Sequence, residues 1–217
     1  MKSYLIIFIC LCILSSCKKK EDAPQPVPAD KLLYETTYAD ASWTTRSTSK
    51  SASSYNSETF RIAIDTVNWM AYELAPYYEL DNMYAVQVDV KLSLTDNTKL
   101  GYAGFIYNYI DTDNYCVMQL CNNGTFFAYQ VKMGTGIQLF YNTVSKDLKK
   151  GPDQTNTIAI RQGNNSQEFI LNGISQGTFP FKQERGYVRV GVLATTYPSY
   201  YTPLVATFDN FVIKKIY

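Results

Sequence analysis

The chain has 217 residues and a formal net charge of +1; 46% of its residues are hydrophobic and 18% are charged. This composition can build a buried core, and the charge gives no electrostatic basis for binding nucleic acid. The chain contains no histidine, which removes the usual Ser–His and Cys–His pairs and most zinc sites. Its nineteen Tyr and eleven Phe favour strands over helices.

Residues 1–17 have the organisation of a targeting segment. Lys2 precedes an apolar run at residues 4–14, which is too short to span a bilayer. The sequence Leu14-Ser15-Ser16-Cys17 then resembles the lipobox of bacterial lipoproteins. This resemblance implies cleavage before Cys17 and attachment of acyl chains such as palmitate to that residue, which would anchor the protein firmly. The alternative is an ordinary signal peptide that contains a chance cysteine.

Residues 18–30 read as a tether. The charged cluster Lys18-Lys19-Lys20-Glu21-Asp22 is similar to the export signal of some Gram-negative surface lipoproteins. It implies a location in the outer membrane, facing either the periplasm or the cell surface; the alternative is a solvated linker beside acidic headgroups. Residues 23–30 are Pro-rich and should be extended. We therefore expect one folded domain at residues 31–217.

The first part of this domain is predicted to be strands and one long loop. Strands are expected at residues 31–38, 59–64, 70–74 and 83–94, and a polar loop at 39–56. The segment 83–94 has the clearest period of two, with Val86, Val88 and Val90 on one face and Gln87 and Asp89 on the other. We expect the valines in a core and the two polar residues in water.

Residues 100–132 predict three consecutive strands at the centre of the domain. The clusters Asp111-Thr112-Asp113-Asn114 and Asn122-Asn123-Gly124 separate runs rich in Tyr, Phe, Val and Ile, which is typical of hairpins. Cys116 and Cys121 share the second strand, about 16 Å apart and on opposite faces. A disulfide between them would break the strand, so we expect free thiols.

The last part of the chain continues this pattern. Strands are expected at residues 137–141, 155–161, 167–171, 187–194 and 204–216. Asn172-Gly173 is the strongest two-residue hairpin signal, and no segment has the pattern of an amphipathic helix. About a dozen short strands predict an all-β fold of two antiparallel sheets.

The order of several short motifs resembles a known family. These are Gly104-Phe105, Asp113-Asn114-Tyr115, Gly124, Leu171-Asn172-Gly173 and Phe208-Asp209-Asn210-Phe211. Together they resemble the concanavalin A-like (laminin G-like) jelly-roll domains of bacterial exported proteins, over residues 31–217. The resemblance implies a two-sheet jelly-roll sandwich in which the first and last strands are neighbours.

Some relatives with this fold are glycoside hydrolases, which need two suitably spaced carboxylates. Laminarinase-type relatives carry Glu-x-Asp-x-x-Glu on one strand, and no such string occurs here. Asp111 and Asp113 have a suitable spacing, but their place in a turn explains them, since Asp side chains there bond the backbone. We expect no catalysis and no cofactor.

A non-catalytic carbohydrate-binding module is the function we expect, because sugar sites combine exposed aromatic rings with polar groups. The candidates lie in Tyr-rich loops or are the two tryptophans: Tyr77, Tyr78, Tyr197, Tyr200, Tyr201, Trp43 and Trp69. The alternative is a structural or protein-binding surface module, since tyrosines also sit half-buried in loops and Trp43 could cover the end of a sheet. An exposed coplanar row of rings would favour glycan binding, and scattered buried rings would favour structure.

Calcium is the metal to consider, because related domains hold it through loop oxygens. Asp209 and Asn210 are candidate ligands, with Asp65 behind them. The alternative is that Asp209 accepts backbone hydrogen bonds where the last strand bulges.

Overall fold

A computed structural model of the chain describes residues 29–217, apart from 77–79, 82, 97, 182–185 and 199–202. The described residues form strands joined by turns and loops. The strands are β1 (Lys31–Thr36), β2 (Ser51–Asn56), β3 (Thr59–Ile64), β4 (Trp69–Leu74), β5 (Tyr84–Leu94), β6 (Tyr102–Asp111), β7 (Asn114–Cys121), β8 (Thr125–Lys132), β9 (Thr135–Val144), β10 (Thr155–Gln162), β11 (Ser166–Leu171), β12 (Ile174–Pro180), β13 (Arg189–Thr196) and β14 (Leu204–Lys215).

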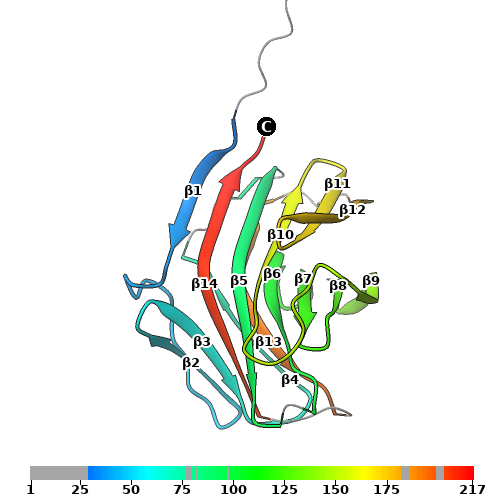
Figure 1. Cartoon of the computed structure of the whole chain (residues 1–217). Coiled ribbons are helices and arrows are strands. Elements are labelled where there is room, and N and C mark those ends of the chain that lie inside the picture. The colour runs from blue at the N-terminus through cyan, green and yellow to red at the C-terminus, as the bar shows by residue number, and fades with distance from the viewer. Residues whose placement is uncertain (1–28, 77–79, 82, 97, 182–185, 199–202) are drawn as a thin grey trace, which may run out of the picture.

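These strands make two antiparallel sheets that face each other (Figure 1). The eight-stranded sheet has the order β12-β11-β10-β5-β14-β3-β2, and β1 pairs with β14 beside it. The six-stranded sheet has the order β4-β13-β6-β7-β8-β9. The predicted all-β, two-sheet jelly-roll sandwich is confirmed, including the pairing of the first and last strands.

One hydrophobic core fills the space between the sheets. On β5 the side chains of Val86, Val88 and Val90 are fully buried in this core. Gln87 on the opposite face is exposed and Asp89 is half-buried, so the predicted register is confirmed. The two cysteines of β7 are buried and free, also as predicted.

The prediction of a polar loop at residues 39–56 is wrong for its last six residues. Residues 51–56 form β2, which pairs with β3 from Ser51–Ile64 to Asn56–Thr59. The segment is SASSYN, and its serines conceal the strand because small polar residues carry little β preference. It forms a strand because both of its sides are hydrogen-bonded, one to β3 and the other to residues 46–48.

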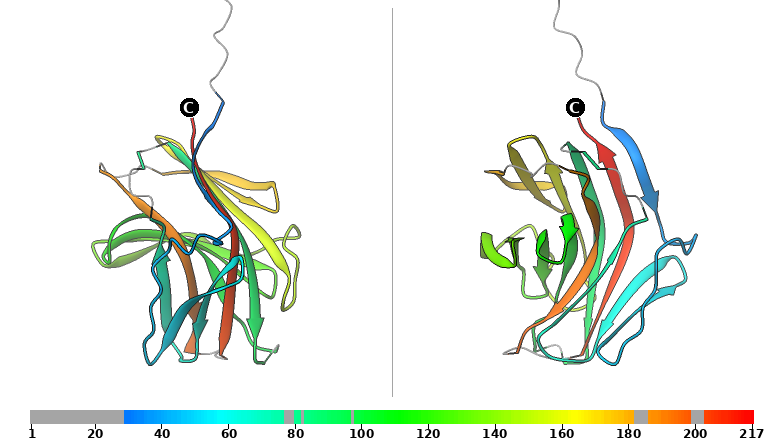
Figure 2. Two further views of the ribbon diagram at one scale, coloured as in Figure 1. Left: turned by 90° about the vertical axis from the view of Figure 1, so that its left-hand side faces the viewer. Right: turned by 180° about the vertical axis from the view of Figure 1, so that it is seen from behind.

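The described chain begins and ends at the same end of the sandwich (Figures 1 and 2). This follows from the antiparallel pairing of Lys31 with Lys215. Among the described residues, no helix is long and apolar enough to cross a membrane.

Candidate functional site

The outer face of the six-stranded sheet, which points away from the other sheet, is lined by aromatic side chains. Inward positions of β6, such as Phe105 and Tyr107, join the main core, whereas Ile106 forms a second cluster with Val117 and Leu193. These three side chains are fully buried although they lie on the outer side. They are covered by a set of rings that we call the aromatic face: Tyr72, Tyr102, Tyr109, Tyr115, Phe127, Tyr129 and Tyr197.

The rings of the aromatic face form one continuous series. Tyr197 packs on Tyr102 with ring centres 5.0 Å apart, and Tyr102 packs on Phe127 at 5.6 Å. The series continues through Tyr129, Tyr115 and Tyr109 to Tyr72, with centre-to-centre distances from 5.7 to 6.5 Å. Phe127 and Tyr129 are nearly parallel, at 8°, and the other pairs are tilted or edge-on. The rings are therefore contiguous rather than scattered, but they are not coplanar; Tyr102 is buried and the other six are half-buried.

The six-stranded sheet curves toward this face. The Tyr129 hydroxyl on β8 lies 3.9 Å from the Met70 sulfur on β4, although β13, β6 and β7 lie between these strands. Four strand spacings on a flat sheet are roughly 19 Å, which is further than a Tyr and a Met side chain can bridge. The aromatic face is therefore the concave face of the sheet.

A bulge at Asn108 sets which side chains of β6 reach this face. Asn108 has a left-handed backbone, with φ of 48°, and the pairing of β6 with β7 shifts register between Tyr107 and Asp111. The Asn108 side chain points inward, where its Oδ1 accepts a hydrogen bond of 2.6 Å from the Tyr84 hydroxyl. The next residue, Tyr109, then falls on the outer side.

Polar groups accompany the rings. Gln119 on β7 is fully buried; its Nε2 donates to the Thr195 hydroxyl at 2.6 Å, whereas its Oε1 has no hydrogen-bond partner. The Tyr72 and Tyr109 hydroxyls lie 3.3 Å apart. Burial, together with this hydrogen bond, raises the pKa of Tyr72 to about 12, and burial also raises the pKa of Tyr129. The Tyr72 and Tyr129 hydroxyls therefore stay protonated at neutral pH and can both donate and accept.

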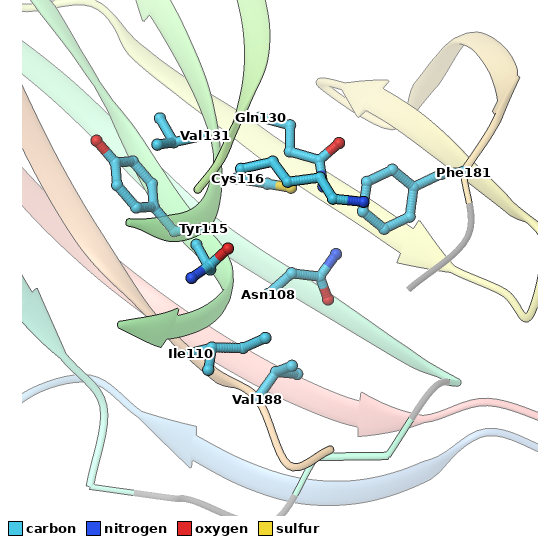
Figure 3. Close-up of a pocket in the computed structure, with 10 residues that line it drawn as sticks. Asn108, Ile110, Tyr115, Cys116, Gln130, Val131, Phe181 and Val188 are labelled. Atoms are coloured by element: carbon cyan, nitrogen blue, oxygen red, sulfur yellow. The ribbon is translucent and has the colours of Figure 1, made fainter. Parts of the chain in front are cut away.

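A small pocket lies beside Tyr115, among inward side chains such as Asn108 and Val188. Figure 3 shows Tyr115 and Phe181 on opposite sides of it, with Cys116 and Gln130 between them. Its volume is about 20 Å³, which is room for about one water molecule. Burial raises the pKa of the Cys116 thiol to about 12, so this thiol is neutral and unreactive. The pocket is too small for a sugar ring.

The predicted loop tyrosines fall in different places. Tyr77, Tyr78, Tyr200 and Tyr201 lie outside the described residues. Tyr197 is half-buried and belongs to the aromatic face. The Tyr-rich loops of the sequence predict rings in loops, whereas most rings of the aromatic face lie on β4, β6, β7 and β8. The available signal was the absence of polar alternation in residues 102–131, where both faces of the strands are apolar.

The two predicted tryptophans differ. Trp43 is 3% exposed and packs between Phe60 and Phe211 in the core, with ring centres 5.6 and 5.0 Å away. It is a core residue, and the expectation that it presents a ring to ligand is corrected. Trp69 is half-buried at the start of β4 and lines a groove at the sheet edge.

The candidate calcium ligands lie at a bulge of β14. The register of β14 against β5 shifts between Asp209 and Val212, and the Asn210 amide donates to Asp209 Oδ1 at 2.7 Å. This matches the alternative in which Asp209 serves the bulge. Burial and the nearby Asp89 carboxylate raise the pKa of Asp209. Within the described part of the chain, no three His, Cys, Asp or Glu side chains come together as a metal site.

The pair Asp111 and Asp113 serves a turn, as predicted. Asp111 Oδ1 accepts hydrogen bonds from the Asp113 amide at 2.8 Å and from Asn114 Nδ2 at 2.9 Å. On the neighbouring strand, β7 presents Tyr115, Val117 and Gln119 to the concave side.

The fold of this chain resembles that of several solved structures. No protein-family model matches the chain, and no curated protein matches its sequence. Among solved structures, it resembles the carbohydrate-binding module CBM66 from Bacillus subtilis, with a TM-score of 0.58 and 11% identity over 80% of this chain and 96% of that one. It also resembles the laminarinase catalytic domain from Thermotoga maritima, with a TM-score of 0.61 and 8% identity over 88% of this chain and 100% of that one.

A third neighbour is a Bacillus subtilis protein of unknown function with a galectin-like fold, with a TM-score of 0.57 and 8% identity over 86% of this chain and 98% of that one. The chain thus has the jelly-roll sandwich fold that these binding, galectin-like and hydrolase structures share. At such identities the likeness concerns the fold alone, because one fold hosts many functions.

Proposed function

We propose that the protein is a lipid-anchored cell-envelope protein whose sandwich binds carbohydrate, without catalysis, at the aromatic face. The observation that carries this proposal is the continuous series of seven aromatic rings on the concave side of the six-stranded sheet. Aromatic rings cover the C–H faces of sugars, and nearby hydroxyls and amides orient the sugar hydroxyl groups.

The polar groups of the face support this choice. Gln119 has a buried carbonyl oxygen without a partner, and such a group costs free energy unless it finds a donor. A water molecule beside this oxygen would supply that donor and would link it to a sugar hydroxyl at the surface. The neutral tyrosine hydroxyls of the aromatic face suit an uncharged ligand.

The proposal does not include hydrolysis, because the outward side chains of β7 are not carboxylates. Glycoside hydrolases use a pair of carboxylates on either side of the scissile bond. The outward positions of β7 carry Tyr115, Val117 and Gln119 instead, and the laminarinase-type acidic string is absent from the sequence.

The anchor part of the proposal rests on the sequence. Cys17 would carry the lipid, residues 18–30 would be the tether and residues 31–217 the folded domain. The location would be the outer membrane, with the domain facing the periplasm or the cell surface.

The proposal is tested with the full chain, purified in a zwitterionic detergent that contains no sugar. A glycan array identifies a ligand, and titration then compares variants. Tyr115→Ala should weaken binding by about tenfold, or ~1.4 kcal/mol, because it removes the ring that joins Tyr129 to Tyr109 within the series. Tyr115→Phe keeps the ring and should bind nearly as well as the wild type.

The control is Tyr217→Ala, since Tyr217 is half exposed and follows β14 of the other sheet. It should leave affinity unchanged. An empty array, or a folded Tyr115→Ala variant with wild-type affinity, would contradict the proposal. An empty array would favour the alternative in which the rings form a second core in a structural or protein-binding module.

A further inference from the structure

A groove of about 290 Å³ lies where one edge of each sheet meets the other, between β2 and β4. Its lining includes Arg46, Ser51, Ser53, Trp69, Tyr72 and Glu73. Ligand pockets usually measure roughly 300–1,000 Å³, so this groove suits one small ring rather than an oligosaccharide. Met70 and Tyr72 line the groove and also belong to the outer side of the six-stranded sheet. The groove is therefore continuous with the aromatic face.

Glu73 is the unusual residue of this groove. Its side chain is 5% exposed; Oε1 accepts a hydrogen bond of 3.0 Å from the Ser53 hydroxyl, and Oε2 lies 3.3 Å from Arg46 Nε. A carboxylate offers about four acceptor positions, so these two contacts leave capacity for further donors. Removing a carboxylate from water is costly, and an apolar side chain would join the two edges at a lower cost.

Two further residues line the groove: Arg46 supplies a hydrogen-bond donor and Trp69 supplies an aromatic ring. The Arg46 side chain is 64% exposed, so its guanidinium can also donate to a ligand. Trp69 Nε1 donates to the Ser51 hydroxyl at 3.2 Å, which fixes the ring. The ammonium of the exposed Lys50 lies over the Trp69 ring, 4.2 Å from its centre. The ammonium therefore covers a ring face that is at the protein surface, and a sugar that packs on this face displaces it.

We propose that this groove is a subsite that holds one neutral sugar ring at the edge of the aromatic face. Trp69 packs against the C–H face of the sugar, Glu73 accepts hydrogen bonds from vicinal hydroxyls, and Arg46 donates to them. The ligand is neutral because an acidic sugar would meet the Glu73 carboxylate. The inference deepens the proposed function and rests on it, since it assigns the residues that recognise one ring of the bound glycan.

The test uses the fact that the chain has two tryptophans, of which Trp43 is in the core. NMR spectra of the full chain, labelled with ¹⁵N on the indoles, report on both rings, and Trp69→Phe assigns the signals. Glucose, galactose, mannose, xylose and fructose are titrated individually, followed by the neutral oligosaccharides built from them. At least one of these sugars should shift the Trp69 signal and leave that of Trp43 in place.

Variants then identify the polar groups. Glu73→Gln and Arg46→Gln should each weaken the binding that the Trp69 signal reports by about tenfold. The matched control is Asp81→Asn, which breaks an exposed ion pair with Lys215 of 2.8 Å and should change nothing. If Glu73→Gln does not fold, Arg46→Gln decides, because that side chain is exposed.

A Trp69 signal that no sugar of the panel shifts would overturn the inference, and so would wild-type affinity in a folded Arg46→Gln variant. The two proposals fail separately. Suppose that Tyr115→Ala weakens glycan binding and that no sugar shifts the Trp69 signal. The aromatic face would then remain the proposed site, and the subsite in the groove would be ruled out. A Trp69 response, together with wild-type affinity of Tyr115→Ala for the glycan from the array, would keep the groove and remove the aromatic face.

Discussion

Two asparagines in left-handed backbone conformations decide which way neighbouring side chains point. Asn108 on β6 and Asn210 on β14 have φ of 48° and 49°, and each lies at a shift of register. Asparagine tolerates this conformation better than most residues. Each side chain then bonds across to another strand, Asn108 to Gln162 at 3.3 Å and Asn210 to Asp89 at 2.9 Å. A strict period of two cannot predict such a shift, so it could not place Tyr109.

Asn108 offers a direct test at this scale. Asn108→Ala should lower the free energy of unfolding by about 2–4 kcal/mol, because the buried Tyr84 hydroxyl loses its acceptor and alanine resists a positive φ. Asn108→Gly loses the same side chain but keeps the backbone conformation, and should be about 1 kcal/mol less destabilised. Urea unfolding measures both. Equal stability of Asn108→Ala and the wild type would show that the bulge does not depend on this residue.

At the scale of strands, the sequence predicted most elements because their apolar residues are patterned. On β5 one face meets the other sheet and the other face meets water, so alternation identified both its existence and its register. β6, β7 and β8 are apolar on both faces, so their existence was clear, but the pattern could not tell the main core from the concave face. β2 was missed because its serines carry no pattern, and pairing with β3 determines its conformation.

The register of β5 gives the prediction for this scale. Val88 is fully buried and pairs with Ile158 on β10. Val88→Asp should unfold or severely destabilise the domain, since an unpaired buried charge is costly. Gln87→Asp, one residue away on the exposed face, should be nearly neutral. Thermal melts of the two variants compare them, and the opposite order would mean that the register is wrong.

At the scale of the molecule, the groove and the expected tether lie at opposite ends of the sandwich. Ser51 pairs with Ile64, and Ile64 pairs with Leu204 at the start of β14. The chain enters the fold beside Lys215, at the far end of the same strand. Eleven residues of strand span about 36 Å, and the extended Pro-rich linker adds to this distance. A lipid at Cys17 would therefore leave the groove directed away from the membrane.

This arrangement depends on the anchor, which only the sequence predicts. Cys17→Ala should abolish incorporation of a clickable fatty acid and either release the protein into the soluble fraction or leave it unprocessed, because the acylated thiol is gone. Cys12→Ala is the matched control: it removes a cysteine from the same targeting segment and should leave labelling intact. Metabolic labelling followed by membrane fractionation measures both variants. Equal label on Cys17→Ala and the wild type would contradict the lipoprotein assignment, and the sandwich would then have to reach its ligand without a tether at this end.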